Sequence, residues 1–328
     1  EILENLDKRQ KIVTECFADV LPRMERKLDD NPFSSTLKIA EGCNNRCAYC
    51  VIPSIRGEYR SKKIEDILDE ARELAEAGCK ELILIAQDVT NYGIDLYGQY
   101  KLPELLRQLC RIDGIEWIRL MYCYEDRITD ELIDVMASEP KICKYIDIPI
   151  QHASDAVLKA MRRRSSEASI ENTIERLRAK IPDIHIRTTF IVGFPGETDE
   201  DYEKLYDFVD RMRFARLGVF TYSREENTPA GEMENQIDED VKEERMDGIM
   251  RRQLDISLEL NQEKIGQTLE VLVEEQDEDG SWLGRSRYDA PEIDNSVIFT
   301  SNRSLKPGDI VSVRINDAFD YDLVGVEV

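Results

Sequence analysis

Long apolar runs, histidine and excess basic charge are all scarce in this sequence of 328 residues. No stretch approaches the about 20 consecutive apolar residues of a membrane-spanning helix, and no signal-peptide pattern opens the chain. The 44 Lys and Arg are outnumbered by 68 Asp and Glu, which gives a net charge of −24. Such a chain repels nucleic acid unless its basic residues cluster. We therefore expect no membrane partner, and either a basic partner or a charge that serves solubility alone.

Cysteine is also sparse. Eight residues in a chain of this length are too few for a disulfide-stabilised scaffold. Three of them lie within eight positions, at 43, 47 and 50. This pattern favours a reducing, cytoplasmic location and a metal site over disulfides. The other five are scattered and are expected to be packed thiols: Cys16, Cys79, Cys110, Cys123 and Cys143.

Three regions follow one another along the chain. Residues 1–32 are charged and helical in pattern, and we expect them to lead in from an upstream domain. Residues 33–265 alternate helical patterns with six β-prone runs, at 36–40, 81–86, 117–122, 145–150, 185–192 and 215–221. The helical pattern over 64–77 ends at Gly78, and another begins at Thr198. This alternation predicts an α/β fold with a parallel sheet, either doubly wound or an incomplete (β/α) barrel.

The sequence pattern changes from helical to β-prone after a long charged helical stretch at 238–264. Residues 266–328 hold five short β-prone runs with turn signals between them, at 268–273, 282–285, 296–300, 310–315 and 323–328. Five antiparallel strands in about 60 residues predict a small OB-like β-barrel.

The cysteine triplet has the spacing C-x3-C-x2-C and directly follows the first predicted strand. Three thiolates in one loop can hold three corners of an iron–sulfur cubane and leave the fourth iron open. Structural zinc instead requires four ligands, usually in two pairs, and no second pair exists here. A ferredoxin loop has a different spacing and a fourth cysteine. We therefore expect Cys43, Cys47 and Cys50 to bind a [4Fe-4S] cluster.

With Tyr49 before its last cysteine, this triplet resembles the signature of radical S-adenosylmethionine (SAM) enzymes. The resemblance implies a partial (β/α)6 barrel in which SAM chelates the open iron. It also implies that one electron cleaves SAM to methionine and a 5′-deoxyadenosyl radical, which abstracts hydrogen from an unactivated carbon. An electron donor such as flavodoxin or ferredoxin is implied as well.

Further segments, in order along nearly the whole chain from about residue 33, resemble the radical SAM methylthiotransferases, whose C-terminal barrel is a TRAM domain. They include 52–61, 86–93, 149–155 and 191–198. Two branches compete: a MiaB-like branch that modifies a tRNA adenosine, and a RimO-like branch that modifies an aspartate of the small-subunit ribosomal protein S-twelve. The segment 284–294, Gly-Arg-Ser-Arg-Tyr-Asp-Ala-Pro-Glu-Ile-Asp, resembles the RimO-like branch.

Charge supports the same branch independently of the resemblance. Residues 266–328 carry 14 acidic and 5 basic residues, a net charge of −9. A barrel that binds RNA should be basic, whereas an acidic one suits a basic ribosomal protein. We therefore expect this barrel to dock the ribosomal protein and not tRNA. A non-catalytic iron–sulfur module that docks a partner is a third hypothesis.

The resemblance also implies roles for residues around the cluster. Tyr49 is expected near the adenine of SAM, with packing as the alternative. Gln87 and Asp88 end the second strand, where the family places polar contacts to the methionine amino group; a strand-end turn is the alternative. Gln151 and His152 end the fourth strand on the active face; Gln151 is expected to contact SAM, and His152 is expected to form a hydrogen-bonding wall, with an acid/base role as the alternative.

Residues in and just after the fifth strand have either a functional or a purely structural interpretation. Arg187 lies inside this strand, so its charge must be paired, either with the SAM carboxylate or with an internal Asp or Glu. Gly193 and Gly196 follow the strand and allow a close backbone approach. The resemblance implies an adenine contact there, and a simple tight turn is the alternative.

One departure from the family concerns the beginning of the chain. Methylthiotransferases carry an N-terminal domain with three more cysteines and a second [4Fe-4S] cluster, to which sulfur insertion is attributed. Here only Cys16 precedes the triplet, and the first residue is Glu1. We therefore expect this chain to lack that domain, to cleave SAM, and not to complete methylthio transfer alone.

Overall fold

A six-stranded parallel sheet forms the centre of the protein in the computed structural model, which describes residues 32–328. The predicted helical lead-in and Cys16 lie outside the described residues, apart from position 32. The sheet order is β1-β4-β5-β6-β7-β8, and every neighbouring pair is parallel. The strands are β1 Ser34–Lys38, β4 Glu81–Ile85, β5 Trp117–Leu120, β6 Ile142–Gln151, β7 His185–Val192 and β8 Arg216–Thr221. The prediction of a partial (β/α)6 barrel is confirmed.

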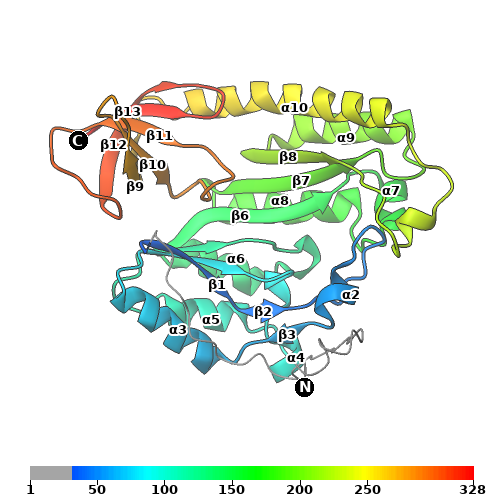
Figure 1. The fold of residues 1–328 in the computed structure, drawn as a ribbon, viewed down its shortest axis with the longest axis horizontal. Helices are drawn as coiled ribbons and strands as arrows, with labels where there is room; N and C mark the ends of the chain where they lie inside the picture. The colour runs from blue at the N-terminus through cyan, green and yellow to red at the C-terminus, as the bar shows by residue number, and fades with distance from the viewer. Residues whose placement is uncertain (1–31) are drawn as a thin grey trace, which may run out of the picture.

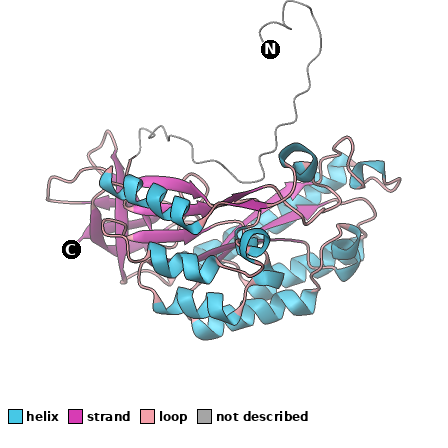
Figure 2. Ribbon diagram, turned by 90° about the horizontal axis from the view of Figure 1, so that it is seen from below, coloured by secondary structure: helices cyan, strands magenta, loops and turns pink. Residues whose placement is uncertain are grey.

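Helices connect these strands and lie mainly outside the curved sheet (Figures 1 and 2). The longer ones are α3 Ile64–Glu76, α5 Leu102–Leu109, α6 Asp130–Ser138, α8 Glu167–Lys180, α9 Asp199–Met212 and α10 Glu239–Gln262. Short elements border the strand ends: β2 Ala40–Glu41, β3 Arg60–Ser61, α2 Ile52–Arg56, α4 Ile94–Tyr97, α7 Asp155–Ala160, η1 Val89–Asn91, η2 Glu125–Arg127 and η3 Ala230–Glu232. No helix in the described part of the chain is both long and apolar enough to cross a membrane.

Local sequence accounts for where the helices begin and end. Helix α9 starts at a capping box, in which the Thr198 hydroxyl accepts from Asp201 N and the Asp201 carboxylate accepts from Thr198 N. Helix α3 is followed by Gly78 at a φ of 101°, a conformation that glycine adopts without steric cost. Its buried side chains recur every three or four residues, which places them on one face: Ile64, Ile67, Leu68, Ala71 and Leu74.

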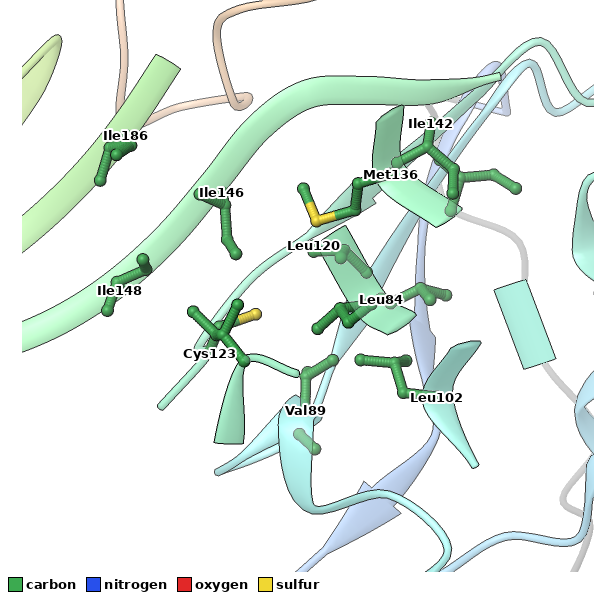
Figure 3. Packing of buried hydrophobic residues seen from close by; sticks show 14 of the residues in the cluster. Leu84, Val89, Leu102, Leu120, Cys123, Met136, Ile142, Ile146, Ile148 and Ile186 are labelled. Carbon is green, nitrogen blue, oxygen red and sulfur yellow. The ribbon is translucent and has the colours of Figure 1, made fainter. Parts of the chain in front are cut away.

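The main hydrophobic core fills the space between the sheet and these helices (Figure 3). Leu84, Leu120 and Ile146 from the strands pack near Leu102 of α5 and Met136 of α6. The opposite, inner face of the sheet is less completely covered. Along β7 the residues alternate strictly between buried and half-buried, because one face meets the helices and the other faces the interior of the incomplete barrel.

The C-terminal part of the chain forms a closed barrel of five strands, in the order β10-β11-β13-β12-β9. These are β9 Thr268–Gln276, β10 Trp282–Ser286, β11 Val297–Thr300, β12 Ile310–Ala318 and β13 Leu323–Glu327. Four neighbouring pairs are antiparallel, as predicted. The expectation that all strands are antiparallel is wrong for one pair, because β11 and β13 run parallel. Closing a five-stranded sheet requires one such pair, since an odd number of strands cannot alternate in direction all the way round.

This small barrel lies at the end of the sheet where the parallel strands begin (Figure 1). Arg285 of β10 reaches Glu81, the first residue of β4, with 2.6 Å between Nη2 and Oε2. Arg119 of β5 binds the other oxygen of Glu81 at 2.8 Å, and both side chains are fully buried. The segment between β10 and β11 also reaches the sheet, where Asp289 pairs with Arg216 of β8 and Asp294 pairs with Arg187 of β7.

Candidate functional site

The three clustered cysteines lie in the loop between β2 and α2, at the end of the sheet where the strands finish. Gly42 opens this loop with a φ of 83°, and a Cβ there would overlap the backbone carbonyl of Glu58. The loop is held from three sides by backbone hydrogen bonds: Cys43 N donates to Gly57 O, Ala48 N donates to Met161 O, and Ala230 N donates to Ala48 O. The positions of the cysteines are therefore fixed by backbone contacts.

All three thiols are free, and they line one cavity of about 380 Å³. Burial raises the pKa of Cys43 and of Cys50. Within residues 32–328, no three ligating side chains converge as they would on a single metal ion. In a [4Fe-4S] cluster each thiolate binds a different iron, so the three sulfurs need not converge on one point. The soft sulfur donors present here suit a [4Fe-4S] cluster.

Side chains form hydrogen bonds to two of the cysteine sulfurs. Asn45 Nδ2 donates to Cys43 Sγ at 3.4 Å, and the Tyr124 hydroxyl lies 3.6 Å from Cys47 Sγ. Burial raises the pKa of Tyr124, which keeps this hydroxyl protonated. It would therefore be the donor toward a thiolate. Hydrogen bonds to ligand sulfurs are one of the means by which a protein sets the reduction potential of a cluster.

Asp88, which was expected near the methionine amino group, is occupied elsewhere. Its carboxylate is buried, caps η1 by accepting from Asn91 N, and accepts from Asn45 Nδ2 at 3.0 Å. It also pairs with Arg127. Burial raises the pKa of Asp88, and Arg127 opposes that rise. Asp88 thus holds the cysteine loop against the end of β4 and caps the turn that follows this strand.

The cavity is walled by residues from the ends and the inner face of the strands. Tyr49, Gln87, Gln151 and Arg187, all proposed from the sequence, line it. Gln87 Oε1 is buried and has no hydrogen-bond partner among the described residues, so it can receive a polar group of a ligand. Three residues that line the cavity have a positive φ although they are not glycine: Arg46, Tyr122 and Gln151.

Arg187 has internal partners. Its Nη1 lies 3.0 Å from Asp147 Oδ1, and its Nε lies 3.4 Å from Asp294 Oδ1. Asp147 belongs to β6, and Asp294 belongs to the segment between β10 and β11. Of the two partners predicted for Arg187, the structure has the internal carboxylate.

Two other predicted residues do not line this cavity. His152 is fully buried; its Nδ1 accepts from Ser154 N at 2.9 Å, and its Nε2 lies 3.5 Å from Glu197 Oε2. His152 is therefore not among the residues that line the cavity. A Cβ on Gly193 would overlap the side chain of Lys242, so the close approach at Gly193 is made by α10.

A second cavity of about 340 Å³ adjoins the first and shares Cys43, Cys50 and Gln87 with it. It extends to the edge of the sheet, where Lys38 and Ile85 line it. Two larger cavities, of about 590 and 560 Å³, lie away from the cysteines, one beside α3 and α5 and the other at the junction with the C-terminal barrel. Of these four cavities in the described part of the chain, the adjoining pair is the one lined by thiols.

Sequence reasoning missed the contribution of the C-terminal barrel to this site. Ile293, between β10 and β11, lines the first cavity although it lies some 240 positions after the cysteines. The same segment places Asp289 against Arg216 of β8, with 2.5 Å between Oδ1 and Nη2, and Asp294 against Tyr145, whose hydroxyl donates at 2.7 Å. Charged residues inside apolar strands, such as Arg119 in Trp-Ile-Arg-Leu, were the signal that such partners exist.

Comparison with known proteins agrees with this geometry. Residues 37–209 match the family model "Radical SAM superfamily", and residues 265–328 match "TRAM domain". Proteins of this superfamily use a [4Fe-4S] cluster and SAM. A solved structure of the radical SAM methyltransferase TsrM from Kitasatospora setae, with cobalamin and a [4Fe-4S] cluster bound, superposes with a TM-score of 0.51 at 19% identity. It covers 60% of this chain and 38% of TsrM, and shows the fold alone.

Curated relatives are much more similar in sequence. The ribosomal protein uS12 methylthiotransferase RimO of Desulforamulus reducens is 54% identical over 92% of this chain and 68% of its own length. That of Clostridioides difficile is 51% identical over 99% of this chain and 74% of its own length. The chain therefore belongs to the RimO family of radical SAM methylthiotransferases.

Proposed function

We propose that this protein transfers a methylthio group to the β-carbon of an aspartate in ribosomal protein uS12. The observation that carries the proposal is the identity of about one half to relatives with that activity in their names. The three free thiols that line one cavity supply the matching chemistry. Because its substrate is a ribosomal protein, we propose that the enzyme acts in the cytoplasm.

The residues proposed to hold the cofactors are those of the cavity. Cys43, Cys47 and Cys50 would each bind one iron of a [4Fe-4S] cluster. When bound, the cluster and SAM supply hydrogen abstraction from an unactivated carbon, with one electron from a donor such as flavodoxin or ferredoxin. We propose that Tyr49, Gln87 and Gln151 contact SAM, because they line the cavity beside the cysteines. The interior partners of Arg187 and the contact of Gly193 with α10 argue against a SAM contact at either.

For the domain organisation, we propose a radical SAM domain over 33–265 and a TRAM domain over 266–328. The match at 265–328 supports a boundary near residue 266, and the match at 37–209 falls within the proposed radical SAM domain. We further propose that the TRAM domain docks uS12, since its net charge of −9 suits a basic partner. tRNA, a polyanion, would be repelled by the same surface.

The test is anaerobic reconstitution of the full-length enzyme with iron, sulfide and SAM, followed by mass spectrometry of uS12 and of tRNA; SAM cleavage is measured with this chain. Methylthiolated aspartate in uS12 is the expected product. Methylthiolated adenosine in tRNA would instead establish the MiaB-like function. SAM that stays intact under reducing conditions, with about four irons bound per chain, would leave a non-catalytic iron–sulfur module.

The metal assignment is tested separately. Replacing any one of the three cysteines with Ala should reduce bound iron and abolish SAM cleavage. Replacing Cys110 with Ala is the matched control, because this buried thiol lies outside the cavity lining and should leave the iron content unchanged. Stoichiometric zinc in the anaerobic wild-type protein would contradict the assignment.

A further inference from the structure

Three basic side chains border the two adjoining cavities, and they differ in how far their charge is neutralised. Arg187 is half-buried and contacts two carboxylates, those of Asp147 and Asp294. Arg46 is exposed on the cysteine loop. Lys38 is the last residue of β1, which places it on a rigid strand of the sheet beside Cys43 and Cys50.

The charge of Lys38 is poorly compensated. Its ion-pair partner within residues 32–328 is Glu41, at 3.7 Å between Nζ and Oε2. Glu41 already has a closer cation, since its Oε1 lies 2.8 Å from Arg56 Nη1. The Lys38 side chain also keeps 44% of its surface exposed, against 17% for Arg187. The ammonium of Lys38 can therefore pair with a further anion.

The proposed substrate carries such an anion into the cavity. An aspartate whose β-carbon is to react must bring its carboxylate close to the cluster, and a carboxylate that leaves water needs a charged or hydrogen-bonding partner. We propose that Lys38 binds the carboxylate of the substrate aspartate and so selects aspartate at this position. This inference rests on the proposed function and adds the residue that reads the substrate.

SAM also has a carboxylate, so the experiment must separate the two sources. Affinity for recombinant uS12 is measured anaerobically in the presence of SAM, for uS12 with its target aspartate and for the same protein with Asn at that position. Affinity for SAM alone is measured in parallel. The variants are Lys38→Met, which keeps the aliphatic chain without the charge, and Lys38→Arg, which keeps the charge. Lys204→Met is the matched control, because Lys204 is exposed on α9 and pairs only with Glu200 at 3.4 Å within the described residues.

A hydrogen bond between charged groups contributes enough to change affinity by about tenfold to a hundredfold. Wild type and Lys204→Met should prefer aspartate-bearing uS12 by about that factor. Lys38→Met should bind the aspartate form more weakly by the same factor and bind both forms alike, while Lys38→Arg should retain the preference in part. Circular dichroism and thermal unfolding of each variant confirm that the fold is kept.

Each remaining outcome overturns the inference. If Lys38→Met weakens SAM and keeps the preference for aspartate, Lys38 binds the carboxylate of SAM instead. If it alters neither affinity, Lys38 reads no carboxylate. If the wild-type protein binds neither form of uS12, the proposed function fails, and the inference fails with it; a wild-type preference that survives in Lys38→Met leaves the proposed function standing.

Discussion

Glu81 is a buried carboxylate whose neutralisation should destabilise the protein. It is fully buried, at the junction of the sheet and the C-terminal barrel, and it pairs with Arg119 at 2.8 Å and Arg285 at 2.6 Å. Ser34 donates a further hydrogen bond to it at 2.9 Å. Glu81→Gln keeps the shape of the side chain, leaves the buried guanidinium of Arg119 without its ion-pair partner, and leaves Arg285 with Glu274 alone.

Two independent estimates give the size of the effect. Removing one partner of a buried ion pair costs about 3–5 kcal/mol. Burial alone would raise the pKa of Glu81, but Arg285 and Arg119 outweigh it and lower this pKa from 4.5 to about 2. At about 1.4 kcal/mol for each pKa unit, that shift corresponds to about 3 kcal/mol of stability from the ionised carboxylate. We therefore expect Glu81→Gln to lower the free energy of unfolding by about 3 kcal/mol or more at neutral pH.

The shift also fixes the pH dependence. Because the pKa is lower in the folded state, this stabilisation is fully present above pH 4.5 and is lost as the pH falls from there toward 2. The difference between wild type and Glu81→Gln should therefore narrow over that interval.

The assay is denaturant unfolding, followed by circular dichroism, of wild type and variants over a pH series. Glu131→Gln is the matched control, because Glu131 pairs with Arg107 at the same 2.8 Å but on the surface, with 59% of its side chain exposed. An exposed pair contributes at most about 1 kcal/mol. If Glu81→Gln were no more destabilising than Glu131→Gln, or if its effect did not change with pH, the reasoning about the buried charges would be wrong.

Three further predictions concern the cysteine loop and the docking surface. Tyr124→Phe removes a hydroxyl near Cys47 Sγ and should lower the reduction potential of the cluster in an EPR-monitored titration with dithionite; an unchanged potential would show that the hydroxyl does not reach the sulfur. Gly42→Ala forces a side chain into a φ of 83° and into a backbone carbonyl, and should destabilise the loop by about 1–3 kcal/mol and reduce iron retention, whereas full retention would contradict the argument. Docking of uS12 should depend on three exposed carboxylates, those of Glu275, Asp277 and Glu278. When all three are replaced by Lys, association should slow several-fold at low salt, and the difference from wild type should disappear at high salt because the charges are screened. Equal rates at low salt would exclude the docking role.

Glu274, the neighbour of these carboxylates, shows what the sequence could not reveal about this surface. In the sequence it is one of the acidic residues of the predicted docking barrel. In the structure its Oε1 accepts from Arg285 Nε at 2.6 Å, so its charge is neutralised and belongs to the junction with the sheet. Reversing it would disturb the fold as well as docking, and the test leaves it intact.

Elements with a local cause were predictable from the sequence. The six strands, the helix that starts at Thr198 and the cysteine loop all follow from periodicity, capping and spacing, which act over a few residues. The partners of buried charges have no local cause. Glu81 and Arg285 lie 204 positions apart, and either could have paired with other residues of opposite charge. The contact of Gly193 with Lys242 likewise depends on how α10 crosses the end of the sheet.

The segment 284–294 acquires a physical role from these long-range partners. It was the part of the sequence that indicated the RimO-like branch, and an exposed substrate-docking surface would have been a natural place for it. Instead, it places Arg285, Asp289 and Asp294 against Glu81, Arg216 and Arg187 respectively, on three different strands of the sheet. An incomplete barrel leaves the inner face of its sheet uncovered near the starts of the strands. Here the charges on that face are neutralised by residues of the C-terminal barrel. Because Ile293 of the same segment also lines the cavity beside the cysteines, the C-terminal barrel helps to shape the site in which the substrate aspartate is proposed to react.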